Sequence, residues 1–406
     1  MGGSIMSWKW KWLAVFAAAA LALGACGQSK QTAGTEKESS NQTAVEKQEK
    51  PKEEEKTENE KEEAEVDYAG AFSEALAELE KAKQGGAVDF GKVESIYKEK
   101  LQPLVQKRDA EFEDTLDQHI TNALAAGKDG SLEPLVVKQI FDKLMQKVFY
   151  TTIKHEFTEA EEHWANKEEV KEELEEAKAF YAILQSTVEK RDVAYGTKLV
   201  DAINGAFAQM EQAVQNDDAL SFALGKQVVD KTLMKTFYLA SGALPHGYAA
   251  KAAAAAKENA EEAKVEQAEG WAFYQSVYPY MKRHAAEEAD YILKQFDLQT
   301  DVKTLDPKAV NHAFVRGWAK VALHEYEESK ENWGQDKSVI TALEGALFIN
   351  MIENDIKTLL GDKAYSTLND QAARYLEAAK AKNKAEADKW LPQIEAALQQ
   401  VVEKAK

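Results

Sequence analysis

Proline is scarce in this chain, and its scarcity limits the architectures open to it. The 406 residues contain seven prolines, and none occurs between Pro134 and Pro245. Because proline removes a backbone N–H and clashes with the preceding turn, long proline-free stretches favour helices. From Asp67 onward, apolar residues recur three and four positions apart with Lys and Glu between them. One such run consists of Val137, Ile140, Phe141, Leu144 and Val148. The chain is therefore predicted to be all-α.

Several helical segments recur along the chain in a fixed order. The matching pairs and triplets are residues 138–150 with 226–238, 105–109 with 188–192 and 281–284, 176–180 with 269–273 and 344–348, and 155–164 with 324–333. Repeated units of roughly 75–95 residues are large enough to close their own cores. We predict tandem helical bundles, with a continuous superhelix as the alternative.

The N-terminus has the features of a targeting segment. Lys9 and Lys11 precede an apolar run from Leu13 to Leu23, and small residues follow. The stretch Leu23-Gly24-Ala25-Cys26 resembles the lipobox of bacterial lipoproteins. The resemblance implies that Cys26, the sole cysteine, is lipidated and becomes the mature N-terminus. An uncleaved anchor or a free buried cysteine is the alternative.

Residues 28–67 are dominated by Gln, Ser, Thr, Lys and Glu and contain no aromatic residue. Such a composition cannot bury enough apolar surface to offset the entropy of ordering. We predict a disordered, self-repelling tether that holds the body away from the membrane, as suits a Gram-positive cell wall.

These observations divide the chain into six parts. They are a signal peptide (1–25), the lipidated cysteine and tether (26–67), three helical repeat units (68–172, 173–265 and 266–340) and a partial fourth unit that caps the array (341–406).

Charge and missing motifs narrow the function. The chain has 51 Lys and Arg against 70 Asp and Glu, a net charge of −19, which disfavours nucleic acid as a partner. A single cysteine excludes an intramolecular disulfide and an all-thiolate zinc site. A phosphate-binding glycine loop, a Gly-x-Ser-x-Gly elbow on the mature chain and a His-Glu-x-x-His motif are all missing. We expect no enzyme; a hydrolase built on a carboxylate pair is one alternative.

The repeated segment that begins with His-Glu carries the candidate metal ligands. On a helix, His155, Glu159 and His163 stand four residues apart and share one face. The second copy offers His324, Glu327 and Glu328, with Asn332 where the first has His163. Mixed nitrogen and oxygen ligands suit iron, zinc or manganese. The alternative is a solvated helix surface.

Adjacent aromatic pairs suggest a second kind of ligand. They are Phe149-Tyr150, Phe180-Tyr181, Phe237-Tyr238 and Phe273-Tyr274, accompanied by Trp271 and Trp318. A haem could lie between such rings with a histidine as axial ligand. Alternatively, one ring of each pair fills a bundle core and the other lies at a junction between units.

Local signals predict boundaries and one further contact. Residues that favour turns (Gly, Asn, Asp and Pro) occur at 129–130, 216–218 and 306–307, so helix boundaries are expected there. A helix break is expected at 242–245. The Ala-rich stretch 249–263 is expected to be one helix. The repeated Lys-Arg-Asp at 107–109 and 190–192 is interpreted as a salt bridge that sets how units dock, or as an anion clamp.

The predicted lipid anchor and acidic helical body loosely resemble the imelysin-like lipoproteins of bacterial iron uptake. Their Gly-x-His-x-x-Glu signature is represented by His324 and Glu327, with Ala322 at the glycine position. The resemblance implies a lipid-anchored extracytoplasmic protein that captures a metal ion such as iron, with a membrane permease or envelope protein as partner. Alternatives are a structural or interaction lipoprotein without a small ligand, and a haem-binding surface lipoprotein.

Overall fold

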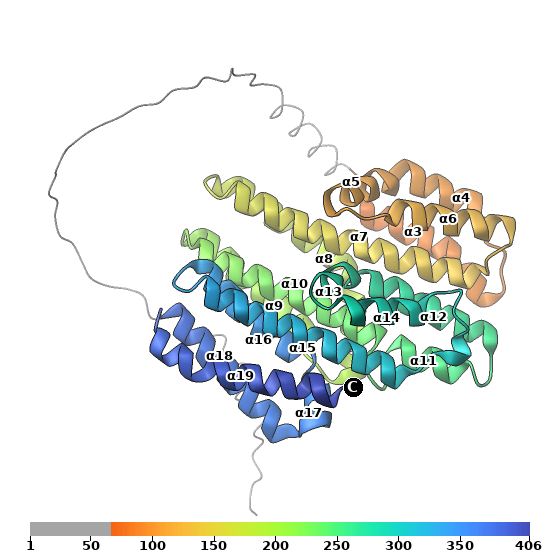
Figure 1. Ribbon diagram of the computed structural model, residues 1–406. Coiled ribbons are helices and arrows are strands. Elements are labelled where there is room, and N and C mark those ends of the chain that lie inside the picture. Colours follow the sequence, from red (N-terminus) through yellow and green to blue (C-terminus); the bar gives the residue numbers. More distant parts are fainter. Residues whose placement is uncertain (1–65) are drawn as a thin grey trace, which may run out of the picture. The chain divides into compact units, whose positions relative to one another are not determined.

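The computed structural model describes residues 66–406, so the predicted signal peptide, Cys26 and nearly all of the predicted tether lie outside the described residues. Residues 66–406 form a succession of helices joined by short connections, and no strand occurs among them (Figure 1). The all-α prediction is thereby confirmed. None of the helices in this region combines the length and apolar character needed to cross a bilayer.

The first helices assemble against one side of the long helix α7. Asp67 starts the series, because its carboxylate accepts a hydrogen bond from the Gly70 amide (2.8 Å) and caps the first turn. The elements up to the end of α7 are α3 (Tyr68–Glu80), η3 (Lys81–Gln84), α4 (Phe90–Ile96), η4 (Tyr97–Leu101), α5 (Gln102–Phe112), α6 (Leu116–Asp129) and α7 (Pro134–Glu162).

In the middle of the chain, a second long helix packs against the helices on either side of it in the sequence. Its elements are α8 (Lys167–Tyr195), α9 (Leu199–Gln215), α10 (Ala219–Ser241) and α11 (Tyr248–Ala255). Helix α10 ends at Ser241 whereas α7, which carries the matching segment, continues to Glu162. This difference in length agrees with the helix break predicted at 242–245.

The last third of the body is built around α15 and α16. Its elements are α12 (Ala260–Gln275), α13 (Tyr278–His284), α14 (Ala286–Phe296), η5 (Val302–Thr304), α15 (Pro307–Glu331), α16 (Asp336–Met351), α17 (Glu353–Leu360), α18 (Asp362–Lys380) and α19 (Lys384–Lys404). In Figure 1, α7, α10 and α15 follow one another across the molecule with similar inclination.

The Ala-rich stretch does not form one helix, so the prediction for 249–263 is wrong. Helix α11 ends at Ala255 and α12 begins at Ala260. The Asn259 side chain accepts hydrogen bonds from the amides of Glu261 (3.0 Å) and Glu262 (3.3 Å). Alanine favours helix formation, but an asparagine that caps exposed amides starts a new helix.

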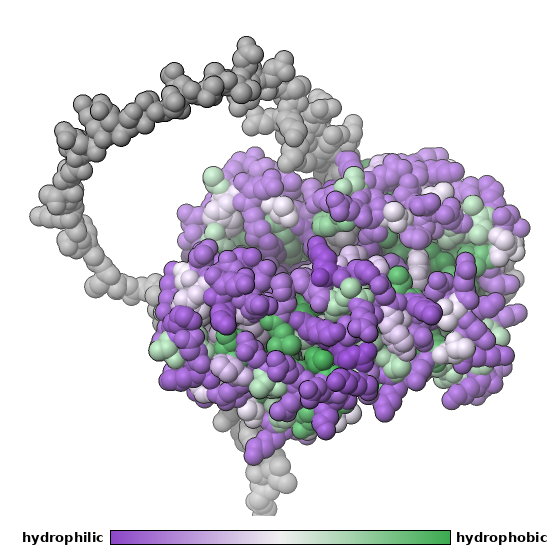
Figure 2. All heavy atoms as spheres, viewed as in Figure 1, coloured by the Kyte–Doolittle hydropathy of each residue, from purple (hydrophilic) through white to green (hydrophobic). Residues whose placement is uncertain are grey.

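The buried apolar side chains form one continuous cluster from Tyr68 to Ala405. The core therefore runs across the predicted borders at 172, 265 and 340, and those borders stay predictions. The face of the molecule in Figure 2 is mostly hydrophilic, with smaller apolar areas between the charged side chains. Residues 66–406 thus have a complete core of their own.

The aromatic pairs take part in this packing. Phe149 packs against Phe72 and Phe180, with ring centroids 5.3 and 6.0 Å apart. Its neighbour Tyr150 donates a hydrogen bond to Asp230 of α10 (2.6 Å). Tyr238 likewise donates to Asp355 of α17 (2.7 Å). One ring of each of these pairs therefore serves the core, and the other joins successive parts of the body.

The repeated Lys-Arg-Asp motif makes a different contact from the predicted one. Asp109 accepts hydrogen bonds from the first amides of α6 (2.9 and 2.8 Å), and Asp192 accepts them from the first amides of α9 (2.7 and 3.1 Å). Arg108 lies 3.3 Å from Glu111 in its own segment. The aspartates thus satisfy amides that a helix start leaves unpaired, and both copies do so alike.

Candidate functional site

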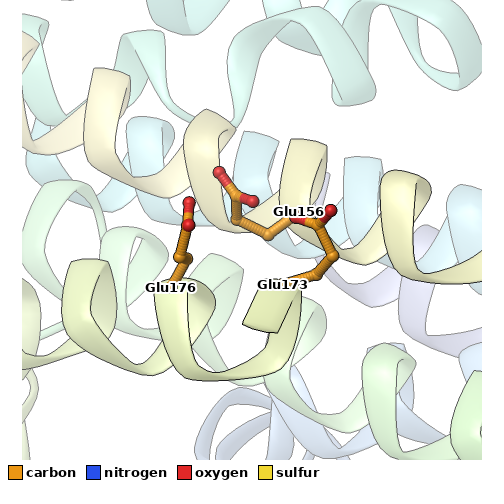
Figure 3. Close-up of side chains that lie close together, drawn as sticks. All are labelled: Glu156, Glu173 and Glu176. Atoms are coloured by element: carbon orange, nitrogen blue, oxygen red, sulfur yellow. The ribbon is translucent and has the colours of Figure 1, made fainter. Parts of the chain in front are cut away.

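Three carboxylates meet between α7 and α8. Glu156 comes from α7, and Glu173 and Glu176, one turn apart on α8, face it (Figure 3). One oxygen from each lies within 4.8 Å of the others. Glu156 is 3% exposed, and the two α8 residues are half-buried. We call these three residues the carboxylate cluster.

The cluster concentrates negative charge in a poorly solvated place. Burial raises the pKa of Glu156 to about 10, with a hydrogen bond to Glu173 and the charge of Glu176 as further causes, while Arg108 acts in the opposite direction. Neither Glu156 nor Glu173 forms an ion pair with a lysine in the described part of the chain. Because like charges at this distance cannot all persist, Glu156 retains its proton at neutral pH.

One predicted ligand, His163, lies beside this cluster. Its Nδ1 atom is 3.7 Å from Glu173 and 3.9 Å from Glu169, and it makes no hydrogen bond. His155 instead contacts Glu111 of α5 through Nδ1 (3.1 Å). Glu159 is 7% exposed on α7. Of the first predicted set, the structure therefore brings His163 next to a group of carboxylates that the prediction did not include.

The second predicted set lies elsewhere, on α15. The rings of His324 and His284 are 4.5 Å apart, and His324 is 3.7 Å from Glu328. Glu328 is also 3.1 Å from Lys337. His324 and Glu327 line an open hollow together with Glu395 and two lysines, Lys320 and Lys330. The lysines make this hollow a poorer place for a cation than the carboxylate cluster is.

A comparison of the two His-Glu segments explains this difference. Glu325 occupies the position of Glu156 in the second copy, and burial, followed by the charge of Glu344, raises its pKa to about 7. Lys231 forms an ion pair with Glu344 (2.9 Å), and the Tyr280 hydroxyl donates a hydrogen bond to Glu325 (2.7 Å). The second copy thus contains an internal ammonium beside its carboxylates.

Sequence reasoning missed Glu156, Glu173 and Glu176, although a signal was present. Glu156 falls three residues after Ile153 and seven after Phe149, so it belongs to the buried face of α7. A charged residue at an apolar position is informative, because charge is rarely buried without a partner. The positions of Glu173 and Glu176 opposite Glu156 depend on how α8 packs, which no local pattern contains.

Comparisons with known proteins leave the site to be interpreted from its own geometry. No family model matches this chain, and no curated protein and no solved structure matches it either. Chemically, the cluster offers three oxygen ligands in a half-enclosed place with an imidazole nitrogen next to it. Such a set can hold a divalent cation or share a proton.

Proposed function

We propose that this chain is a lipid-anchored, extracytoplasmic binding protein that captures a divalent metal ion, iron first, at the carboxylate cluster. The observation that carries the proposal is the approach of three carboxylates to within 4.8 Å of one another around the buried Glu156. Oxygen ligands at about 2.0–2.6 Å from one cation are separated from each other by roughly 2.8–5.2 Å, so little rearrangement is needed.

Charge balance supports a divalent ion. Three ionised carboxylates carry three negative charges, and Arg108, 4% exposed, supplies one positive charge nearby. In the absence of metal, the proton on Glu156 neutralises one more of the negative charges. A divalent ion that displaces this proton would complete neutralisation, which makes metal binding compete with protonation.

The ligand set favours a transition metal over calcium. Nδ1 of His163 is 3.7 Å from Glu173 and has no hydrogen-bond partner. Imidazole nitrogen suits iron, zinc and manganese, whereas calcium takes oxygen ligands. His163 is 31% exposed, and Glu173 is 16% exposed, so the ion would enter from this side.

The predicted anchor fits a capture role. Lipidated Cys26 and the charged tether would keep the body near the membrane, and the net charge of −19 would raise the local concentration of cations. A membrane permease or another envelope protein would then receive the ion.

The test is metal binding by residues 66–406 purified without chelators. Element analysis and calorimetric titration with Fe²⁺, Mn²⁺ and Zn²⁺ should show about one ion per chain, and Glu156→Gln should weaken binding at least 100-fold. Glu325→Gln, at the matching position of the second copy, is the control and should bind like the wild type.

Two results would overturn the proposal. One is a wild-type protein that stays metal-free when all three ions are offered. The other is retention of metal by Glu156→Gln together with loss in the double variant His155→Ala/His324→Ala, which would transfer the site to the residues predicted from sequence.

A further inference from the structure

A second place in the molecule has the opposite electrostatic character. A cavity of about 370 Å³ lies where α10 meets the start of α9, the end of α16 and α17. Its volume is in the lower part of the usual range for small-molecule sites, about 300–1,000 Å³. Lys235, Thr197 and Asn350 contribute polar atoms to its wall. Leu199, Leu239, Leu347 and Met351 contribute apolar surface.

Lys235 is a buried cation with incomplete charge compensation. Its side chain is 9% exposed, and its ammonium donates to the carbonyl oxygen (2.8 Å) and the side-chain oxygen (3.0 Å) of Asn350. Among the described residues, Glu353 at 4.0 Å has the one carboxylate within ion-pair distance. Burial lowers the pKa of Lys235. An ammonium has three donors, and two of them are used here by neutral oxygens.

The acidic residues near Lys235 have other partners. Glu353 pairs with Lys357 at 2.5 Å. Asp355 accepts hydrogen bonds from Tyr238 (2.7 Å) and Asn311 (2.9 Å), and burial raises its pKa. Asp192, whose charge also acts on Lys235, accepts hydrogen bonds from the Thr197 hydroxyl (2.7 Å) and from the first amides of α9. None of the three carboxylates is therefore dedicated to Lys235.

The corresponding cations elsewhere in the chain are paired closely. Lys147 is the tenth residue of the segment 138–150, as Lys235 is of 226–238, and it forms an ion pair with Asp114. Arg316 precedes His324 by eight residues, as Lys147 precedes His155, and it lies 3.4 Å from Glu288. Lys235, whose nearest carboxylate oxygen is 4.0 Å away, is thus the least closely paired member of this set.

The sequence shows which residue differs between the two segments. Asp114 follows Asp109 by five positions, and Thr197 follows Asp192 by five positions in the matching segment. The two loops have the same shape, because Glu113 (φ 54°) and Gly196 (φ 64°) are both left-handed and Asp109 and Asp192 cap the next helix alike. Where the first copy supplies an internal carboxylate, the second copy has a threonine that lines a cavity.

We propose that this cavity binds a small carboxylic acid with a hydrocarbon body, whose carboxylate takes beside Lys235 the place that Asp114 takes beside Lys147. The ammonium of Lys235 would hold the carboxylate, next to Thr197, whose hydroxyl donates to Asp192 (2.7 Å). The leucines and Met351 would cover the body of the ligand, since apolar walls favour an apolar group that leaves water. Glu353 and Asp355 also line the cavity, and Lys231 and Lys357 in its wall already have carboxylate partners. A second negative charge is therefore disfavoured, and a monocarboxylate fits better than a phosphate or a dicarboxylate.

Hexanoate is the probe for this proposal. Calorimetric titration of residues 66–406 should show binding of hexanoate, weaker binding of acetate, which lacks the body, and no binding of hexan-1-ol, which lacks the charge. Inorganic phosphate should bind more weakly than hexanoate. Binding of phosphate in preference to hexanoate, or of none of these probes, would overturn the proposal.

Substitutions at position 197 separate charge from size. Thr197→Asp should lower hexanoate affinity at least tenfold, because it provides Lys235 with an internal carboxylate. Thr197→Asn has the same size without the charge and should keep the affinity within threefold. Lys235→Met should lose binding. Equal hexanoate affinity in wild type, Thr197→Asp and Lys235→Met would show that the probe binds elsewhere and would refute the assignment.

Discussion

Lys147 on α7 and Lys235 on α10 occupy the same position of a repeated segment, but their surroundings differ. The side chain of Lys147 is 3% exposed and forms an ion pair with Asp114, whereas the side chain of Lys235 is 9% exposed and lines a cavity together with Thr197. For the buried carboxylates, it is the second segment that has the counter-charge and the first that lacks one. Glu325 and Glu344 have Lys231 beside them, whereas Glu156 faces Glu173 and Glu176.

The comparison shows how matching sequence segments of one chain can have different surroundings. Backbone contacts such as the Asp109 and Asp192 caps are the same in both copies, because each helix start must satisfy its first amides. A counter-charge can be exchanged without altering the backbone. Where that exchange removes an internal partner, the remaining charge is available to an external ligand of the opposite sign.

The largest expected change in the free energy of unfolding comes from breaking the ion pair between Lys147 and Asp114. Asp114→Asn should leave Lys147 buried without its counter-charge and lower the free energy of unfolding by about 3–5 kcal/mol. Thr197→Asn, at the matching position, should change it by less than about 0.5 kcal/mol. Urea denaturation of both variants measures the difference. Similar losses in the two variants would mean that the two lysines have equivalent surroundings.

A substitution in the carboxylate cluster, Glu156→Gln, is expected to raise the free energy of unfolding by an amount that depends on pH. The pKa of Glu156 is about 10 in the folded protein against an ordinary 4.5, so its stabilising contribution is present below pH 4.5 and is lost as the pH rises toward 10. The glutamine of Glu156→Gln cannot ionise. In the absence of metal, the free energy of unfolding of this variant should therefore exceed that of the wild type by about 2 kcal/mol at pH 8 and should equal it at pH 4. Denaturant titrations at both pH values test this. A gain that does not change with pH would contradict the shifted pKa.

A smaller gain should follow when the second copy is made to resemble the first. Thr197→Asp gives Lys235 a carboxylate and should raise the free energy of unfolding by about 1–2 kcal/mol without ligand, the range of a charged hydrogen bond. Thermal unfolding with and without hexanoate checks it. If the variant is destabilised, position 197 does not approach Lys235 as position 114 approaches Lys147.

The smallest effects should be the same in both copies. Asp109→Ala and Asp192→Ala each remove a carboxylate that accepts from two amides at a helix start, and each should cost about 1 kcal/mol from this loss. Asp192 also accepts from the Thr197 hydroxyl, so its loss is measured in a Thr197→Val background. The two losses should agree within about 0.5 kcal/mol when measured by denaturation in urea. A clear disagreement would show that the capping contacts, like the counter-charges, have diverged.

Much of the fold could be predicted because it depends on local chemistry. Periodic apolar residues and the lack of proline indicated helices, and the boundaries at 129–130, 216–218 and 306–307 coincide with helix ends. The break at Asn259 was missed because alanine propensity was weighed above a capping side chain. The aspartates of the Lys-Arg-Asp motif were interpreted as ion-pair partners, since a sequence does not show that amides eight residues ahead fold back to them.

The sequence by itself determined that this chain is helical and which of its short segments match one another. Only the tertiary structure decided which charges meet. Glu156 and Glu173 lie on two different helices, and Lys235 and Asn350 are separated by 115 residues, so their proximity depends on how whole helices pack. Helix formation is governed by neighbours along the chain, whereas electrostatic interaction is governed by distance in space and by burial. For that reason the residues of both proposed sites emerged only when the packing of the helices was known.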